Sequence, residues 1–441
     1  MPQVNVLLEF EDVRQGAFGL FSLAAESPAE GVQAAENLLD RVAGFGVELE
    51  EEQIPVPMFS EPSAAPPVDE LRAFGTAELS VELPSATTVL AARVPDESLE
   101  ELDQRAGVRV WPNSELTLFS GSGAAPVDCR PFQPGATIEE IQQALGVQVV
   151  WEEGHSGEGI VIGIIDEGVN GDVYPVRGGF EGANAPAPGS APITSHGSMC
   201  AADCLVAAPD VAIYDYPFLG VPNSGGALAM FQSVLDQRRL DGTPHLTNNS
   251  YGFTGVPSPD RFPKHEIWDP QHPLHRKVRE VIVSGAPAFF AAGNCGADCP
   301  SGNCDASGIG PGKSIHASNS LEEVITIAAV NKNRTRIGYS SQGPGMFMAE
   351  KPDLAAYSHL FANFGQGRPG GEPPPFDNGT SAATPVACGV GALLLGAHPG
   401  TSPGRLKQAL IASAVDVPAG GWNADIGHGV IHAGGAFAQL P

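Results

Sequence analysis

A short run of apolar, mostly β-branched residues at positions 159–165 places the strongest constraint on the fold of this chain. Runs of this kind are typical of strands buried on both faces of a parallel sheet. The run ends in Asp166, and a carboxylate at the carboxyl end of such a strand is placed for function. Taken alone, Asp166 is as easily an aspartate that ends its strand in a turn. The sequence therefore predicts an α/β domain and leaves the role of Asp166 to its partners.

A serine in the setting of a nucleophile lies in the segment 377–385. Ser381 follows Gly379 and Thr380 and precedes two alanines, so it is expected at the start of a helix. The glycine permits close approach of the backbone, the alanines permit close helix packing, and the helix N-terminus favours negative charge developing beside the hydroxyl. A Gly-x-Ser pattern alone is a weak signal, so this prediction depends on the rest of the chain.

Two further polar residues stand in contexts that fit the same chemistry. His196 begins a stretch of small and apolar residues and is expected to open a buried helix. Asn294 follows the apolar strand predicted at 288–292. Each has a plainer interpretation, because a histidine in such a place is often a cap or core residue and an asparagine readily occupies a turn.

Taken together, the segments around Asp166, His196, Asn294 and Ser381 resemble, in this order, the subtilisin-like serine proteases, the subtilases. The resemblance extends from about residue 136 to about residue 435. Further similar segments lie at 247–252, 324–330, 339–344, 351–354 and 427–433. The family implies a mostly parallel sheet with helices on both faces.

The resemblance also implies hydrolysis of peptide bonds through an acyl-enzyme. Ser381 is the expected nucleophile, His196 the base that takes its proton, and Asp166 the residue that orients the imidazole. Asn294 is expected to donate its amide to the oxyanion, beside the backbone N–H of Ser381. The residues expected around the bound substrate are Ser250, Tyr251, Gly252, Ala292 and Gly293.

Departures from the family pattern affect the metal prediction and two neighbouring positions. The segment after His196 is too short for the calcium-binding loop of many subtilases, so no metal site is predicted, and the mechanism requires no cofactor. Glu167 follows Asp166 where Ser, Thr or Asp is usual, and Ser198 stands where Thr is common. Both substitutions are expected to be tolerated.

The N-terminal quarter differs in composition from the rest. Residues 1–118 carry 22 of the 51 Asp and Glu but only 6 of the 23 Lys and Arg. Their pattern predicts the βαββαβ order of a ferredoxin-like α+β unit, interrupted by a proline-rich connection at 54–67. Strands are expected at 4–10, 77–83, 88–94 and 108–111, with a further candidate at 47–51, and helices at 29–43 and 96–105.

Residues 89–111 resemble the subtilase propeptide, which chaperones folding and inhibits its own enzyme. An unrelated ferredoxin-like adaptor is the alternative, because this fold serves many functions. We therefore expect a propeptide-like domain at 1–118, a Gly-, Ser- and Pro-rich linker at 119–137 and a catalytic domain at 138–441. Residues 115–119 are expected to enter the catalytic site and pair with the strand around Tyr251, with self-cleavage near 118–123.

The charge and hydropathy of the chain limit the classes of partner that it is expected to bind. A formal net charge of −28 disfavours nucleic acid and anionic membranes. No run approaches the roughly 18 apolar residues of a membrane span. Residues 1–12 lack the basic start of a signal peptide, so a cytoplasmic location is expected unless a leader has been removed. The expected partners are a peptide or protein substrate and the chain's own N-terminal domain in cis.

The seven cysteines fall into different settings. Cys200 and Cys388 are expected as buried thiols, and Cys204 is four residues from Cys200 and could share its helix face. The cluster directly after Asn294 favours a disulfide or free thiols over zinc, because the spacing is not that of paired Cys-x-x-Cys ligands. The cluster consists of Cys295, Cys299 and Cys304, and Cys129 lies in the predicted linker.

Two alternatives to an endopeptidase stay open. A macrocyclase or transpeptidase of the same fold would use identical catalytic residues, with an amine displacing the acyl group before water does. A binding protein without turnover would keep the fold alone, and the presence of all four predicted catalytic side chains disfavours it.

Overall fold

The computed structural model describes residues 2–11, 37–49, 55–59, 86–119, 135–182, 185–363 and 376–441. It separates into two compact units, Met1–Asn113 and Ser114–Pro441. The division precedes the boundary predicted at residue 118, because residues 114–119 are hydrogen-bonded within the second unit. Most of the predicted linker lies outside the described residues, and its last residue, Thr137, already caps a helix of the second unit.

The first unit is built on an antiparallel sheet in the order β2–β4–β1–β5. This is the strand order of a βαββαβ ferredoxin-like unit, so the predicted α+β topology is confirmed. The four strands are β1 (Gln3–Glu11), β2 (Glu48–Leu49), β4 (Ala86–Pro95) and β5 (Val108–Pro112). The buried core of this sheet consists of Val6, Leu8, Phe10, Val42, Leu90, Ala92, Val94, Leu102 and Val108.

The proline-rich connection contains a strand that was not expected from its composition. β3 (Val56–Phe59) pairs antiparallel with residues 86–89 of β4, whereas β2 pairs with residues 92 and 93 of the same strand. Pro57 is compatible with this place because an edge strand does not need every N–H for the ladder. The strand predicted at 77–83 and the first part of the helix predicted at 29–43 lie outside the described residues.

The helical segments that the structure describes in the first unit are short. The end of the first predicted helix continues as the 3₁₀ turn η2 (Asp40–Val42). The second predicted helix is divided into η3 (Asp96–Ser98) and α3 (Leu99–Asp103).

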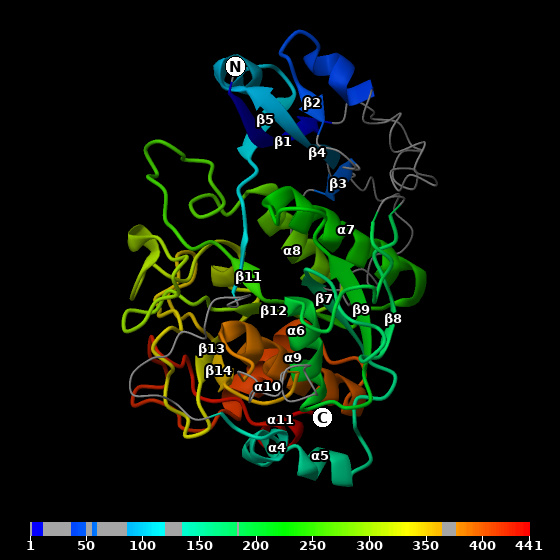
Figure 1. Cartoon of the computed structure of the whole chain (residues 1–441), viewed down its shortest axis with the longest axis vertical. Coiled ribbons are helices and arrows are strands. Elements are labelled where there is room, and N and C mark those ends of the chain that lie inside the picture. The colour runs from blue at the N-terminus through cyan, green and yellow to red at the C-terminus, as the bar shows by residue number, and fades with distance from the viewer. Residues whose placement is uncertain are drawn as a thin grey trace, which may run out of the picture. The chain divides into compact units, whose positions relative to one another are not determined.

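A seven-stranded sheet, parallel throughout, forms the centre of the second unit, in the order β14–β13–β12–β10–β7–β9–β8 (Figure 1). This confirms the predicted α/β fold. The strands are β7 (Val161–Asp166), β8 (Val176–Gly179), β9 (Ala212–Pro217), β10 (Leu246–Asn249), β12 (Ala288–Ala291), β13 (Ile325–Val330) and β14 (Leu354–Tyr357).

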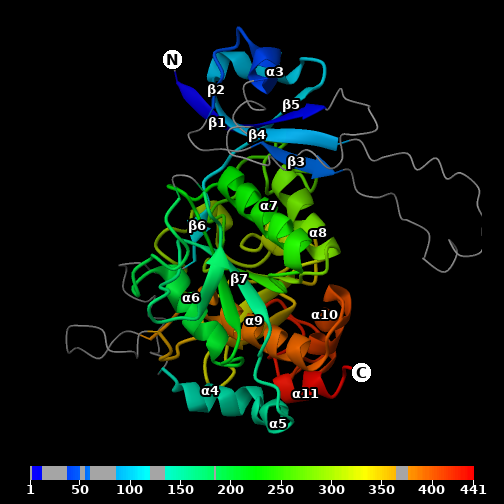
Figure 2. The ribbon, with the colours of Figure 1, turned by 90° about the vertical axis from the view of Figure 1, so that its right-hand side faces the viewer.

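Helices cover both faces of this sheet (Figure 2). One face carries α6 (His196–Leu205), α9 (Thr380–Ala397) and α10 (Pro403–Ala412), and the other carries α7 (Ser224–Asp241) and α8 (Pro273–Val283). The shorter elements are β6 (Thr117–Leu118), β11 (Tyr251–Gly252), α4 (Ile138–Leu145), α5 (Gln148–Glu152), η4 (Ala306–Gly308), η5 (Ala317–Ser320) and α11 (Ala433–Phe437).

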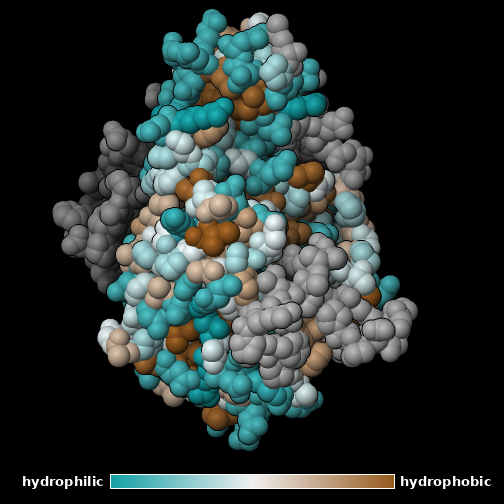
Figure 3. Space-filling view, turned by 60° about the vertical axis from the view of Figure 1, so that its left-hand side comes forward, coloured by the Kyte–Doolittle hydropathy of each residue, from teal (hydrophilic) through white to brown (hydrophobic). Residues whose placement is uncertain are grey.

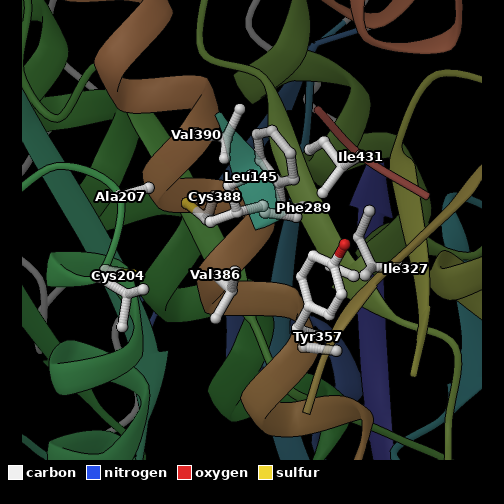
Figure 4. Packing of buried hydrophobic residues seen from close by; sticks show 14 of the residues in the cluster. Leu145, Cys204, Ala207, Phe289, Ile327, Tyr357, Val386, Cys388, Val390 and Ile431 are labelled. Carbon is white, nitrogen blue, oxygen red and sulfur yellow. The ribbon is translucent and has the colours of Figure 1, made fainter. Parts of the chain in front are cut away.

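Successive side chains of the strands pack in two separate hydrophobic cores. Phe289 of β12 packs in the core under α6 and α9, while Phe290 packs in the core under α7 and α8. This alternation is what a strand buried on both faces requires. Figure 4 shows the first core, with Cys204 of α6 and Cys388 of α9 among its side chains. Both are free, buried thiols, as the sequence predicts.

Large hydrophobic side chains are exposed singly over the described surface. They are Val149, Val173, Val221, Leu240, Phe262, Val283 and Val417. The face drawn in Figure 3 is mostly hydrophilic, with small separate hydrophobic areas. Among the described residues, α9 has the length and hydropathy of a membrane span, but 89% of that window is buried, as in the core helix of a globular domain.

Gly389 of α9 lies directly against the backbone of α6. A Cβ atom on Gly389 of α9 would lie 2.2 Å from the carbonyl oxygen of Cys204 in α6. No side-chain movement relieves a contact with backbone, so only glycine permits this helix spacing.

Gly389→Ala is expected to lower the free energy of unfolding by about 2 kcal/mol or more, because it forces the two helices apart. Gly396→Ala is the matched control on the same helix, since its Cβ would lie 3.4 Å from Ile160, an ordinary contact. Urea denaturation followed by circular dichroism measures both. Equal stability of the two variants would show that the helix contact is not constraining.

Candidate active site

Asp166 and His196 form a buried hydrogen-bonded pair. Asp166 is the last residue of β7, and His196 is the first residue of α6. The imidazole Nδ1 lies 2.7 Å from Oδ1 and 2.8 Å from Oδ2 of Asp166, and both side chains are fully buried. Ser195 caps α6 by accepting the N–H of Ser198 at 3.1 Å, which sets where the helix begins. The structure thus brings together the two residues predicted as base and orienting acid.

The surroundings of His196 favour its protonated form. Burial alone lowers the pKa of the imidazole, but the charge and hydrogen bond of Asp166 and the charge of Glu167 outweigh it, so the pKa is raised. Nε2 has no hydrogen-bond partner among the described residues. The ring is therefore oriented through Nδ1, and its other nitrogen is available to take a proton.

Glu167 has a contact that sequence reasoning missed. Its carboxylate accepts the backbone N–H of His196, at the N-terminus of α6, where N–H groups lack partners within the helix. A carboxylate is favoured there by the helix dipole. The departure from the usual family residue therefore places a negative charge beside the catalytic pair.

Ser381 lies in the first turn of α9. Gly379, just before the helix, has φ of 83°, a left-handed conformation that glycine adopts without strain. The Ser381 hydroxyl donates to the carbonyl of Ser250 at 3.3 Å. No hydrogen bond joins the Ser381 hydroxyl to His196 in this arrangement, and hydrogen bonds between a nucleophile and its base often tighten only when a substrate is bound.

Pro385 changes the hydrogen bonding of the serine's own carbonyl. In a regular helix the Ser381 carbonyl would accept the N–H four residues on, which Pro385 lacks. It instead accepts the Ser250 hydroxyl at 3.4 Å and the Cys200 thiol at 3.6 Å. Cys200, predicted only as a core thiol, therefore contacts the site as well.

Cys200 also completes a group of possible metal ligands. Its sulfur lies 3.7 Å from Oδ2 of Asp166, and the ligand atoms of Asp166, His196 and Cys200 lie within 4.8 Å of one another. Burial, followed by the charge of Asp166, raises the pKa of the thiol well above its usual value. The thiol is therefore protonated in this arrangement and donates to Oδ2 of Asp166.

Asn294 follows β12 and is fixed by the start of α9. Its Oδ1 accepts both the backbone N–H and the hydroxyl of Thr380, each at 2.9 Å. Its Nδ2 consequently points the other way and donates to the carbonyl oxygen of Phe119. A disulfide between Cys295 and Cys304 closes the loop that follows, so of the two alternatives expected for this cluster, a disulfide or free thiols, the disulfide is present. Cys299 is disulfide-bonded too.

Residues 114–119 lie as an added strand within this site. β6 pairs antiparallel with β11, Leu118 opposite Tyr251, and the Phe119 N–H donates to the Ser250 carbonyl at 3.0 Å. On the other side, the Leu116 N–H donates to the Pro222 carbonyl at 2.8 Å. The pairing predicted for this segment is therefore confirmed.

The Phe119 ring lies against glycines. A Cβ on Gly252 would approach its Cζ to 2.6 Å, and one on Gly293 would approach it to 3.5 Å. The Phe119 residue is only 4% exposed. Its carbonyl oxygen lies 2.4 Å from the position of a Cβ on Gly379. A side chain at Gly252 or Gly379 would therefore exclude the bound segment.

The predicted substrate-binding residues contribute differently. Ser250, Gly252 and Gly293 contact the segment directly through backbone atoms or the absence of a side chain. Tyr251 supplies backbone pairing, while its hydroxyl donates to Asn249 within the core. Ala292 is buried in the other core and donates its N–H to Ile327. It supports the strand from behind.

A doubly wound parallel sheet with this acid–base pair, serine and amide defines a subtilisin-like serine protease. The family model described as "Subtilase family" matches residues 157–429, and the chain belongs to this family.

Named relatives agree at the level of family and fold. Serine protease AprX of Bacillus subtilis (strain 168) is 29% identical over 158 residues, which cover 32% of this chain and 33% of AprX. Subtilisin DY of Bacillus licheniformis is 26% identical over 290 residues, which cover 61% of this chain and 88% of that protein. The solved structure of fervidolysin from Fervidobacterium pennivorans, described as a keratinolytic enzyme related to subtilisin, aligns with a TM-score of 0.62 at 17% identity. That alignment covers 100% of this chain and 62% of fervidolysin, and it shows the fold alone.

Glu167→Gln is expected to move the acidic limb of the kcat/KM profile to lower pH by about half a unit. A base must be neutral to act, so the raised pKa of His196 places the loss of activity at higher pH. Removing the Glu167 charge lowers that pKa, and glutamine can still accept the His196 N–H. The measurement is the pH dependence of peptide hydrolysis.

Glu158→Gln is the control, because it removes an exposed carboxylate before the opposite end of β7. It should leave the profile in place. A profile that does not move in Glu167→Gln would mean that solvent screens this charge completely.

Proposed function

We propose that this protein is a serine endopeptidase made as a precursor, in which the segment 114–119 occupies its own substrate site. One observation carries the proposal: the Phe119 carbonyl accepts the Asn294 amide while the Phe119 N–H is bound by Ser250. An amide donor directed at a carbonyl oxygen is what acyl transfer requires.

The catalytic roles follow from this geometry. Ser381 attacks the carbonyl of the residue in the Phe119 position, and His196 takes the hydroxyl proton at Nε2 and returns it to the leaving amine. Asp166 holds the imidazole through Nδ1 and stabilises its charged form. Asn294 and the N–H of Ser381, one of the N–H groups without a partner within α9, stabilise the oxyanion.

The bond after Phe119 is the one this arrangement presents for cleavage. It lies within the range expected from the sequence, and the burial of the Phe119 ring supports cleavage at this residue. After cleavage, the strand pairing would keep the segment in place as an inhibitor, because its hydrogen bonds to Ser250 and Pro222 do not depend on the broken bond. The propeptide-like unit before Ser114 would then act in cis.

Ser381→Ala is expected to remain intact, whereas the wild-type chain is cut between Phe119 and Ser120. Intact mass spectrometry of both proteins measures this, and labelling by a fluorophosphonate probe reports the nucleophile independently. The labelling is expected in the wild type alone, because the probe reacts only with an activated serine. Equal probe labelling of the variant would remove Ser381 from the proposal. A wild type that is neither cut nor labelled contradicts the enzyme itself.

The disulfide beside Asn294 supports an oxidising compartment. Such bonds persist outside the reducing cytosol, so we propose export in place of the cytoplasmic location expected from the first residues. Isolated without reductant, the native protein should show Cys295 and Cys304 unreactive toward a maleimide after denaturation. Reduction before labelling provides the positive control. Full labelling of both without reduction contradicts export.

A further inference from the structure

Glu266 is a buried acid at the opposite end of the segment from Phe119. The residue is fully buried, and its Oε1 accepts the backbone N–H of Ser114 at 3.1 Å. Its Oε2 accepts the Ser114 hydroxyl at 2.9 Å. The Ser224 hydroxyl donates to Oε1 from the start of α7. One residue of the bound segment is therefore held through both its backbone and its side chain.

Histidines surround the same carboxylate. His265 Nδ1 lies 3.2 Å from Oε2, and His272 Nε2 lies 3.7 Å from Oε1. His275 lies 2.6 Å from the Glu266 backbone carbonyl through Nε2. Burial alone raises the pKa of Glu266, but His272, His265 and the Ser224 hydroxyl outweigh it and lower the pKa. The carboxylate is therefore ionised at neutral pH and accepts hydrogen bonds only.

Ser114 lies between His265 and Glu266. The Ile267 N–H donates to Nδ1 of His265 at 3.2 Å, and the same nitrogen lies 3.2 Å from Oε2 of Glu266. Burial lowers the pKa of His265 and outweighs the charge of Glu266, which raises it. Nε2 of His265 lies 3.2 Å from the Ser114 hydroxyl. The hydroxyl thus donates to Glu266 while its oxygen lies against the imidazole of His265.

Another peptide bound in the same backbone register would make this contact too. Ser114 is the sixth residue when Phe119 is counted as the first before the cleaved bond. The Ser224 N–H donates to the Ser114 carbonyl at 3.0 Å, and the Leu116 N–H is bound by Pro222. A substrate that pairs with the same backbone groups therefore presents its own sixth residue to Glu266.

We propose that Glu266 and His265 form a distal subsite that selects serine or threonine six residues before the cleaved bond. The inference rests on the proposed function and specifies its substrate class. A hydroxyl donates to the Glu266 carboxylate and at the same time keeps its oxygen within hydrogen-bond distance of the His265 imidazole. Alanine loses both bonds, lysine has no acceptor, and aspartate places a second negative charge against Glu266.

Internally quenched peptides test this selectivity on the full-length protein, where they compete with the bound segment 114–119, so only the ratios between peptides are compared. Four peptides share the sequence of residues 115–119 and differ in the preceding residue, which is Ser, Ala, Lys or Asp. The serine peptide should have the highest kcat/KM, about tenfold above alanine, because a hydrogen bond to a charged group is lost. Equal rates for serine and alanine, or a preference for lysine, overturn the proposal.

Two variants that each remove one carboxylate distinguish an effect of Glu266 from a general effect of lost negative charge. In Glu266→Gln the serine-to-alanine ratio should fall to about twofold or less, whatever the absolute rate. Glu323→Gln removes a partly exposed carboxylate that pairs with Arg279 and should keep the wild-type ratio. A ratio that survives in Glu266→Gln, or falls equally in both variants, contradicts the assignment.

Hydrogen exchange tests the same contact without catalysis. In full-length Ser381→Ala, peptides covering residues 115–119 should be protected, because Leu116 and Phe119 are hydrogen-bonded there. Adding Ser114→Ala or Glu266→Gln should speed their exchange about tenfold, and adding Glu323→Gln should not. Unchanged exchange in the first two overturns the subsite. If this exchange pattern is observed but the fluorophosphonate probe does not label the wild type, the proposed enzymatic activity is contradicted and the subsite is not.

Discussion

Close packing of α6 against α9 is the constraint on which the site depends. Gly389 permits the two backbones to touch at Cys204. His196 lies eight residues before Cys204, and Ser381 lies eight residues before Gly389. The helices also touch nearer their starts, where the Cys200 thiol donates to the Ser381 carbonyl at 3.6 Å. A bulkier residue at Gly389 would force the two helices apart and move His196 relative to Ser381 without touching either one.

Polar groups in this region are satisfied by partners outside their own elements. Pro385 deprives the Ser381 carbonyl of its helical partner, and Ser250 and Cys200 replace it. Asn294 accepts from Thr380 with one end of its amide and donates to Phe119 with the other. Unpaired buried groups would cost about 1–3 kcal/mol each. The same contacts that avoid this cost also hold the catalytic groups in place.

The bound segment combines general and selective contacts. Its backbone pairs with β11 and with the chain before α7, and these hydrogen bonds are available to almost any sequence. Its side chains are held as well: Phe119 lies against glycines, Leu116 packs in the core under α7 and α8, and Ser114 lies between Glu266 and His265. The segment is therefore bound along its whole length.

The α/β class and the four polar residues expected at the site could be predicted from the sequence alone. Strand period, helix starts and short motifs are local, so Asp166, His196, Asn294 and Ser381 could each be identified from its own segment. The burial of Cys200 was also expected, and a disulfide after Asn294 was one of two expected alternatives, but the contact of Cys200 with the site was not expected.

Tertiary structure alone decided the contacts between segments far apart in the chain. β3 depends on an open edge of β4, which its proline-rich sequence does not reveal. The roles of Glu167 and Glu266 arise because each carboxylate meets a backbone N–H from a distant segment. Glu266 precedes its helix in an irregular stretch with no motif, and it lies 152 residues from Ser114. Hydrogen bonds over such separations follow from packing, and no local pattern encodes them.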